Sequence, residues 1–509
     1  MSENLESETR SSKIGASLLA IFAGSLITLA LAPYNLWPAG LLSCCIYIGL
    51  LRNGSLRMAA WLGWLYGIGM FGTGASWVYV SIHEQGNASV PLAVALTAIF
   101  VSALALLHAL FAWIYAALLR NVMAGMLLGF PALWVLFEWI RSWLFTGFPW
   151  LYLGYSSMDT WASGWIPVIG VFGASLLCAF SASCIYLAYM RRNPQAYLIY
   201  GTMIASLWLT GWQLQQAKWV APASATPLTV GLVQANIPQQ MKWRREYYQP
   251  TLTLYQSMTE PLLKQDIVVW PEAAIPSYYQ NAQDFLQPMA AAAERSNTAL
   301  ITGIPWRDAG ASEYHNSIVA MGAGTGVYHK QRLVPFGEYV PLEHWLRGVI
   351  DFFDLPMSSF TPGRSKQSPL LIHDFRVAPF ICYEVVYPDL VRKFARKADL
   401  LITISNDAWF GASLGPIQHL QMARMRALEN GRYMIRATNN GISAIINEQG
   451  EIVTIGNQFQ RETITGEVQV MLGETPFTDI GSIPIIVVCA LTILGLLGAG
   501  TMGLRLQHD

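Results

Sequence analysis

The chain has 509 residues, of which 53% are hydrophobic and only 12% are charged. A chain this apolar is atypical of a purely soluble protein, so a membrane is expected to hold part of it. Lysine plus arginine and aspartate plus glutamate are equal at 31 each, without a long basic run. This balance gives nucleic-acid binding no electrostatic support, and no nucleic-acid partner is predicted.

Eight apolar stretches approach the length of a membrane-spanning helix, which takes ~20 residues. They cover residues 14–33, 37–51, 58–80, 90–119, 122–144, 165–190, 197–212 and 483–504, of which the second and the seventh are short. The first is too long for a signal peptide and lacks its small-residue cleavage pattern. We therefore predict a membrane domain with seven transmembrane helices at residues 1–215, and an eighth transmembrane helix at residues 481–504.

Basic residues beside these stretches predict the orientation of the chain. They gather at alternate loops, as Arg10 and Lys13, Arg52 and Arg57, Arg120, Arg191 and Arg192, and Arg505. The intervening loops at residues 34–36 and 81–89 have no lysine or arginine. By the positive-inside rule both termini are cytoplasmic, and the polar region beyond the seventh helix lies across the membrane. In a bacterial inner membrane that side is the periplasm.

A few polar residues interrupt the apolar stretches. Glu138 and Arg141, three residues apart, are candidates for binding a lipid headgroup, although an ion pair that neutralises itself is favoured. His108 is expected to form a hydrogen bond between helices. Residues 146–155 are rich in glycine, proline and aromatic side chains, which is typical of the membrane interface, and they are candidates for lining a lipid entry.

The polar region at residues 227–470 alternates strand and helix patterns. Short runs, mostly rich in β-branched residues, predict strands at residues 228–237, 266–270, 299–306, 317–321, 377–382, 400–405, 443–446 and 463–470. Helical spacing is found at residues 244–264, 281–296 and 417–430. The predicted class is an α/β sandwich, attached to the multi-span helical membrane domain. Because no nucleotide-binding glycine loop and no metal-ligand spacing occurs, neither a cofactor nor a metal is predicted.

Cys382 follows a short apolar strand and precedes a helical pattern that begins near Tyr387. The other five cysteines lie inside apolar stretches, as Cys44, Cys45, Cys178, Cys184 and Cys489. In an oxidising compartment, Cys382 therefore has no disulfide partner within its domain. Backbone N–H groups and a helix dipole at this position are expected to favour the thiolate, which attacks carbonyl carbon. A buried core cysteine is the alternative interpretation.

Two further stretches of the polar region carry acid and base groups. Glu272 stands in Trp-Pro-Glu at the end of a predicted strand, where α/β folds place their sites. Lys330 and Glu338 stand in a loop at residues 328–341 that is punctuated by proline and glycine. A carboxylate can accept the thiol proton, and an ammonium can stabilise an oxyanion, so Glu272, Lys330 and Cys382 suffice for acyl transfer. Taken singly, such a glutamate or lysine is more often a solvated surface residue.

The order and spacing of these motifs resemble the Glu-Lys-Cys triad of the nitrilase, or carbon–nitrogen hydrolase, superfamily. With membrane spans on both sides, nearly the whole chain resembles the apolipoprotein N-acyltransferase family of Gram-negative bacteria. The resemblance extends to residues 233–239, 405–411, 418–429 and 438–443. It implies an α-β-β-α sandwich as the catalytic domain.

The resemblance also implies a reaction in two steps. Cys382 takes an acyl chain from a phospholipid as a thioester and passes it to the α-amino group of a diacylglyceryl-cysteine on an apolipoprotein. Glu272 matches the base, Lys330 the oxyanion stabiliser and Cys382 the nucleophile. Supporting acidic positions match Glu338 and Glu384, and aromatic positions near the acyl site match Trp243 and Tyr383. A ping-pong cycle suits a site that accepts two large lipids in turn.

Two other functions compete with this interpretation. A membrane-tethered amidase for small periplasmic amides would need one anchor, and eight predicted spans argue against it. A transporter with a sensor domain would place ionisable residues at mid-membrane, and the predicted spans hold almost none beyond His108, Glu138 and Arg141.

Residues 344–360 are unusually apolar for a connection between sheet elements. Loops run over the surface and are normally polar, so these side chains need a covering. One interpretation is that they cap the core of their own domain. The hypothesis we favour is that the segment dips into the outer leaflet and gates lipid entry.

Overall fold

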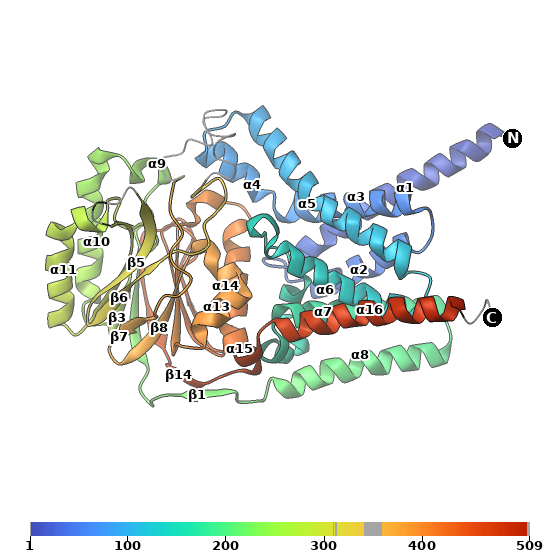
Figure 1. Cartoon of the computed structure of the whole chain (residues 1–509). Helices are drawn as coiled ribbons and strands as arrows, with labels where there is room; N and C mark the ends of the chain where they lie inside the picture. The colour runs from blue at the N-terminus through green and yellow to red at the C-terminus, as the bar shows by residue number, and fades with distance from the viewer. Residues whose placement is uncertain (1, 309, 311–312, 340–358, 506–509) are drawn as a thin grey trace. The chain divides into compact units, whose positions relative to one another are not determined.

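The computed structural model describes residues 2–308, 310, 313–339 and 359–505, and the side chains of residues 13–499 within these ranges. The chain forms two compact units (Figure 1). Unit 1 comprises Met1–Tyr79, Pro91–Ala217 and Ile480–Asp509, and unit 2 comprises Val80–Val90 and Lys218–Asp479. Most of the predicted gating segment, residues 344–358, lies outside the described residues. Phe360 is described, and it is buried with its ring 5.0 Å from that of Tyr314.

Unit 1 is helical. Its main helices are α1 (Ser2–Ala30), α2 (Trp37–Leu51), α3 (Leu56–Gly74), α5 (Val90–Leu118), α6 (Phe130–Arg141), α7 (Ile166–Arg191), α8 (Pro194–Leu214) and α16 (Ile483–Arg505). Among the described residues, three helical segments are long and apolar enough to cross a membrane: Lys13–Ala30, Val90–Leu118 and Trp161–Arg191. Trp37–Leu51 and Ile483–Ala499 are apolar but shorter. Each predicted stretch thus contains a helix, while the count of eight spans stays a prediction.

Glycine allows two of these helices to pack backbone to backbone. A Cβ atom at Gly69 of α3 would lie 2.0 Å from the carbonyl oxygen of Ile21 in α1, and one at Gly24 of α1 would lie 2.0 Å from that of Tyr66. Only residues without a side chain permit this approach. Small residues at helix contacts are the usual packing device inside membranes, where the hydrophobic effect gives little drive for helix association.

Unit 2 is built on a ladder of twelve strands in the order β12-β11-β10-β9-β8-β7-β6-β5-β4-β3-β2-β13. Their bounds are β2 (Leu228–Gln234), β3 (Ile267–Val269), β4 (Ala299–Arg307), β5 (Tyr314–Gly322), β6 (Gly324–His329), β7 (Leu370–Ile372), β8 (Phe375–Ile381), β9 (Leu400–Ser405), β10 (Met434–Thr438), β11 (Ala444–Ile446), β12 (Ile452–Ile455) and β13 (Glu462–Val468). A separate pair joins β1 (Val220–Pro222) to β14 (Met471–Gly473).

The ladder folds back on itself at the short β6–β7 pairing. As a result β5 lies against β8, β2 against β10, and β11 against β13. Helices α10 (Tyr248–Thr259) and α11 (Gln283–Arg295) cover the half that contains β2 to β6, while α13 (Pro388–Ala395) and α14 (Gly415–Asn430) cover the other half (Figure 1). Unit 2 is therefore a sandwich of two sheet layers between two helix layers.

Each of the eight predicted strands coincides with an observed strand, but β6, β7, β10 and β12 of the ladder, and the separate β1 and β14, were not predicted. Two of these fail the usual strand patterns, because β6 begins Gly-Thr-Gly and β10 carries Arg436 within a buried run. Among the predicted helices, that at residues 244–264 is shorter than expected, because α10 is flanked by 3₁₀ turns.

A core between α10, α11 and the adjacent sheet fixes the strand end that carries Glu272. Trp270 is fully buried there with Tyr255 and Leu286. Its indole Nε1 donates to Thr259 Oγ1 at 2.9 Å, so the one polar atom of the ring is satisfied. This packing fixes the position of the residues that follow β3.

Candidate active site

The three predicted catalytic residues follow the ends of three strands of unit 2. Glu272 comes three residues after β3, Lys330 directly after β6, and Cys382 directly after β8. Sites in α/β folds commonly form where strands end, because the turning chain there is free to present side chains. The charges of Glu272 and Lys330 both act on the Cys382 thiol, which means that the three side chains share one site.

Lys330 is buried between two carboxylates. Its Nζ lies 2.8 Å from Glu338 Oε2 and 3.5 Å from Glu272 Oε1, and the side chain is 1% exposed. Burial acts to lower the pKa of this ammonium, but the charges of Glu338 and Glu272 outweigh burial and raise the pKa well above its usual range. Lys330 therefore stays cationic at every physiological pH.

Both oxygens of Glu272 are held by donors. Asn316 Nδ2 donates to Oε1 at 2.7 Å, and the backbone N–H of Asn406 donates to Oε2 at 2.8 Å. The same amide nitrogen of Asn316 also donates to Glu338 Oε1 at 2.8 Å, which ties the two carboxylates together. Glu272 is thus fixed in one orientation beside Lys330, as a base with a defined direction requires.

Cys382 occupies a left-handed backbone conformation, with φ of 52°. A non-glycine residue in this region is uncommon and frequently marks a functional turn. Residue Cys382 is partly exposed, yet burial of the thiol raises its pKa well above the usual value. The Glu272 charge acts in the same direction, and the Lys330 charge opposes it.

The prediction that the local backbone favours the thiolate is wrong for this state of the site. Cys382 begins a five-residue 3₁₀ turn, Cys382–Val386, and the first α-helix after it, α13, starts six residues later. Its dipole therefore does not end at the sulfur atom. The thiol needs a base to remove its proton, and Glu272 is the carboxylate with the largest influence on it.

Glu384 joins the cysteine turn to the Lys330 loop. Its Oε2 accepts from the backbone N–H of Ile381 at 2.9 Å, and its Oε1 accepts from the N–H of Gln331 at 2.7 Å and the Tyr328 hydroxyl at 2.8 Å. Burial raises the pKa of this carboxyl to about 7, against the opposing effect of these donors. These hydrogen bonds hold the cysteine turn against the Lys330 loop.

Of the two aromatic residues implied by the resemblance, Trp243 precedes Glu272 in the sequence and Tyr383 directly follows Cys382. Tyr383 is buried, with its ring 5.4 Å from that of Tyr387. Trp243 directly follows α9 (Gln239–Lys242) and is half-buried. The neighbouring Lys242 is buried, and its Nζ donates to the backbone oxygen of Glu272 at 2.9 Å.

A second buried network supports Cys382 from the residues after β9. Arg436 Nη2 lies 2.6 Å from Asp407 Oδ2, and Ser405 Oγ donates to Asp407 Oδ1 at 2.5 Å. His419 Nε2 lies 3.1 Å from the carbonyl oxygen of Cys382, and its Nδ1 lies 3.1 Å from Arg436 Nη2. Because a carbonyl only accepts, Nε2 carries a hydrogen and donates to Cys382, while Nδ1 also lies 3.2 Å from Asp407 Oδ1.

This network places the charges of Asp407 and Arg436 next to His419, which contacts Cys382. Burial and the Arg436 charge lower the pKa of His419, against the opposing effect of Asp407. Burial acts to raise the pKa of Asp407, but Arg436 and His419 outweigh it and bring the pKa well below its usual range. The carboxylate and guanidinium thus neutralise each other, and the imidazole anchors the strained Cys382 carbonyl.

Sequence reasoning did not single out several of these side chains as functional. They are Lys242, Asn316, Ser405, Asn406, Asp407, His419 and Arg436. Asn316 and Arg436 carried a usable signal, because each is a polar residue inside a buried strand and such residues need partners. Among the described residues, no group of three or more histidine, cysteine or acidic side chains is arranged to hold a metal ion.

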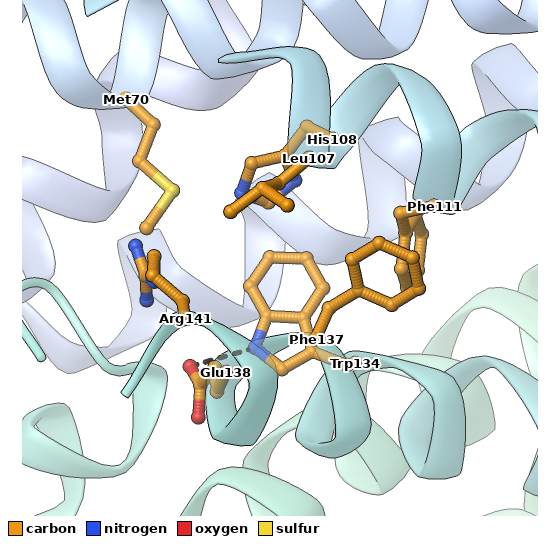
Figure 2. Close-up of a pocket in the computed structure, with 8 residues that line it drawn as sticks. All are labelled: Met70, Leu107, His108, Phe111, Trp134, Phe137, Glu138 and Arg141. Carbon is orange, nitrogen blue, oxygen red and sulfur yellow. Dashed lines mark hydrogen bonds between the residues drawn. The ribbon is translucent and has the colours of Figure 1, made fainter. Parts of the chain in front are cut away.

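Unit 1 has a polar cluster of its own, which lines the small cavity in Figure 2. The cavity measures about 10 Å³, roughly the space of one water molecule, and lies among Met70, His108, Trp134, Glu138 and Arg141. A cavity of this size does not enclose a lipid headgroup, so the structure gives that candidate role for Glu138 and Arg141 no support.

The contacts of this cluster hold parts of unit 1 together. Glu138 Oε1 accepts from Trp134 Nε1 at 2.9 Å and from the backbone N–H of Leu153 at 2.8 Å, the first of which is drawn in Figure 2. The Arg141 guanidinium lies 5.1 Å from the ring centre of Phe71. Pairing of Glu138 with Arg141 and a hydrogen bond from His108 to another helix stay predictions.

Family comparisons agree with the division into a helical and a sheet-containing part. A model of the carbon-nitrogen hydrolase family matches residues 229–477, which hold every site residue described in unit 2. A model described as the apolipoprotein N-acyltransferase N-terminal domain matches residues 23–184. Among solved structures, that of Saccharomyces cerevisiae Nit3, a member of the nitrilase superfamily, is 20% identical with a TM-score of 0.37, covering 50% of this chain and 92% of Nit3.

Relatives that match over nearly their whole length identify the family more closely. The apolipoprotein N-acyltransferase of Azotobacter vinelandii is 47% identical over 91% of this chain and 90% of its own length. Those of Pseudomonas syringae and Coxiella burnetii are 46% and 40% identical, over 93% and 94% of this chain and 95% and 99% of their own lengths. The chain therefore belongs to the apolipoprotein N-acyltransferase family, with a carbon–nitrogen hydrolase domain as its C-terminal part.

Proposed function

We propose that the protein transfers a fatty acyl chain from a phospholipid to the α-amino group of the diacylglyceryl-cysteine of an apolipoprotein, the last step of lipoprotein maturation. The observation that carries the proposal is the convergence of Glu272, Lys330 and Cys382 in unit 2 of a chain that belongs to this family. A thiol, a positioned carboxylate and a buried ammonium are the groups that acyl transfer through a thioester requires.

In the first half-reaction, Glu272 takes the proton of the Cys382 thiol, and the sulfur attacks the ester carbonyl of the phospholipid. The negative charge on the carbonyl oxygen is stabilised by the Lys330 ammonium. When the tetrahedral intermediate collapses, the ester C–O bond breaks and Glu272 returns the proton to the leaving alkoxide. The products are an acyl thioester on Cys382 and a lysophospholipid. The raised pKa of the thiol supports the need for the base.

In the second half-reaction, the neutral α-amino group of the apolipoprotein's modified cysteine attacks the thioester carbonyl. Glu272 accepts a proton from the nitrogen, Lys330 again stabilises the oxyanion, and the C–S bond breaks. The proton then returns to the sulfur, so the enzyme ends as it began. Because the first product leaves before the second substrate reacts, the kinetics are ping-pong.

The remaining predicted residues support these steps. Glu338 holds the Lys330 ammonium, and Glu384 braces the cysteine turn against the Lys330 loop. Tyr383 and Trp243 are proposed to contact the substrates' apolar parts. The cycle is proposed without a cofactor: the thiol proton goes to the leaving alkoxide, and the amine supplies the proton that returns to the sulfur.

We further propose a membrane domain at residues 1–215 with seven spans, a catalytic domain at residues 227–470, and an eighth span at residues 481–504. The enzyme is then a multi-pass protein of the bacterial inner membrane, with a periplasmic catalytic domain and cytoplasmic termini. The apolar helices and the positive loop pattern support this arrangement, because both substrates are lipids held in the bilayer.

Intact mass measurement of the purified protein tests the proposal. Incubation with phospholipid in neutral detergent micelles is expected to add one acyl group and to release lysophospholipid. Later addition of a diacylglyceryl lipopeptide with a free α-amino group should remove the adduct and yield the N-acylated lipopeptide. Cys382→Ala is the control, because it lacks the nucleophile. An adduct of normal yield on Cys382→Ala, or lipopeptide acylation by that variant, would refute the thioester route.

A further inference from the structure

A cleft beside the active site is lined almost entirely by hydrogen-bond donors. It has a volume of about 230 Å³ and is bordered by Lys242, Trp243, Arg244, Arg245, Tyr248 and Ser277, and by Pro276, which has no donor. We call it the donor cleft. The first four residues surround the end of α9, and Ser277 lies five positions after Glu272 in the sequence. Lys242 links the cleft to the catalytic base, since its Nζ donates to the backbone oxygen of Glu272 at 2.9 Å.

Lys242 is a buried cation whose charge lacks a matching anion. Its residue is 1% exposed, and no carboxylate forms an ion pair with it within the described part of the chain. Burial lowers the pKa of this ammonium to about 8, and the more distant Glu272 charge opposes burial only in part. The hydrogen bond to Glu272 uses one of its three N–H groups. Burying a cation is costly unless an anion compensates it, so the cleft is suited to a negative ligand.

Trp243 adds an independent donor without an acceptor. Its indole Nε1 is buried and makes no hydrogen bond among the described residues. A buried N–H group left unsatisfied costs free energy, and such groups in native structures call for an explanation. An acceptor atom in the donor cleft would satisfy this N–H while the ring keeps its apolar contacts.

Arg244 and Arg245 supply exposed positive charge to the lining of the cleft. The side chain of Arg244 is 62% exposed and lies 3.5 Å from that of Glu246, which is 65% exposed. A pair this exposed contributes little and does not lock the guanidinium in place. No aspartate or glutamate lines the cleft itself. The lining therefore combines three cations, an indole N–H and two hydroxyl groups, and it repels no anion.

We infer that the donor cleft binds the phosphate group of the phospholipid that donates the acyl chain. This inference rests on the proposed function. A phosphodiester offers several acceptor oxygens and one negative charge, which match cationic and neutral donors that converge from different sides. The cleft is smaller than the ~300–1,000 Å³ pockets that enclose whole ligands, so it suits part of a headgroup. The diacylglyceryl acceptor has no phosphate, so the donor cleft selects the donor lipid over the acceptor.

The test compares an acyl donor that has a phosphodiester headgroup with one that has no headgroup. Phosphatidylethanolamine and 1,2-diacylglycerol with identical chains are presented in neutral detergent micelles at fixed ionic strength. The initial rate of thioester formation on Cys382 is followed by intact mass. For the wild type, kcat/KM is expected to be about tenfold or more higher with the phospholipid. In Arg244→Gln/Arg245→Gln this preference should fall below about threefold.

The matched control removes two exposed positive charges from another surface of unit 2. Lys264→Gln/Arg295→Gln makes the same change in net charge, and it should keep the wild-type preference for phospholipid. Equal losses in the two double variants would overturn the proposal, since they would indicate general attraction to the lipid surface. An unchanged preference in Arg244→Gln/Arg245→Gln would overturn it as well.

A free phosphate ion has the same acceptor oxygens and is the alternative ligand for the cleft. If Arg244→Gln/Arg245→Gln abolished an effect of inorganic phosphate on the reaction with diacylglycerol but kept the preference for phospholipid, the cleft would belong to the free ion and the proposal would fail. Failure of the proposed function has a different outcome, because the wild type would then form no adduct on Cys382 with either lipid.

Discussion

Each unit of the protein buries a glutamate and a cation, and only the cluster of unit 2 is a candidate for catalysis. In unit 1, Glu138 and Arg141 are each 4% exposed. In unit 2, Glu272 is 8% and Lys330 is 1% exposed. Burial alone therefore does not distinguish the clusters, although buried charges are a common signal of function.

The two clusters differ in the hydrogen-bond partners of their glutamates. An oxygen of Glu138 accepts from Trp134 and from the backbone of residue 153, so it holds a loop to a helix. Glu272 is instead oriented by Asn316 and Asn406 beside Lys330, and its charge acts on the thiol of Cys382, a residue that is partly exposed. A carboxylate that is held by others and faces a reactive atom is a catalytic candidate, whereas one that holds the backbone is structural.

Replacing each glutamate by glutamine is the strongest test of this contrast. Glu272→Gln should reduce thioester formation about 10²–10⁴-fold, the usual contribution of a general base, with the melting temperature little changed. Glu138→Gln should lower the melting temperature and leave the rate per folded molecule near that of the wild type. Intact mass and thermal unfolding measure both effects. If Glu138→Gln lost activity without losing stability, the structural role of Glu138 would be contradicted.

Loss of the Lys330 ammonium should have the next largest effect on the rate. In Lys330→Ala the thiol remains but the oxyanion loses its donor, at a cost of roughly 3–4 kcal/mol in the barrier to acylation. The variant also leaves Glu272 and Glu338 close together without a cation, which destabilises the fold. The double variant Lys330→Ala/Glu338→Gln serves as the control, since it relieves that repulsion. Recovery of activity in the double variant would argue against the oxyanion role.

His419 tests whether the network beneath the nucleophile positions it. Removal of the imidazole in His419→Ala leaves the Cys382 carbonyl without its donor, and we expect ~1–3 kcal/mol less stability. The rate of thioester formation should also fall, because the left-handed turn at Cys382 loses its anchor. His419→Gln, which retains an N–H donor, should restore part of the rate. If His419→Ala melts earlier but acylates at the wild-type rate, the network only stabilises the fold.

Glu384 predicts a smaller effect that depends on pH. Its pKa is raised to about 7 in the folded protein, above the ordinary value for glutamate. Between the two values the folded state holds a proton that the unfolded state has released, so this group lowers the free energy of unfolding as pH rises towards 7. Relative to Glu384→Gln, the wild type should therefore lose stability between pH 5 and about 7 and change little above it. Parallel denaturation curves at these pH values measure the difference, and a constant offset would contradict the prediction.

The strand ends that carry chemistry were predictable from the sequence. The apolar run before Cys382 and the run before Glu272 predict short strands, and β8 and β3 lie there. The polar Lys330 loop was also found, but β6 before it was missed because glycine weakens the strand pattern. The helix-dipole argument for a thiolate failed because it used proximity in sequence, while the pKa of a thiol depends on burial and on charges close in space.

The sequence by itself determined which segments are apolar helices, where the strands that bear Glu272 and Cys382 end, and the family to which the motifs belong. These properties depend on local periodicity and residue order, which any reader of the chain can follow. Only the tertiary structure decided which buried charges converge. Lys330 and Glu272 are 58 residues apart, and Asn406 and Glu272 are 134 apart. Contacts over such separations are set by how the two sheet layers pack, and no local pattern encodes them. For the same reason the donor cleft beside Glu272, and the one-water cavity beside Glu138, were visible only in the folded chain.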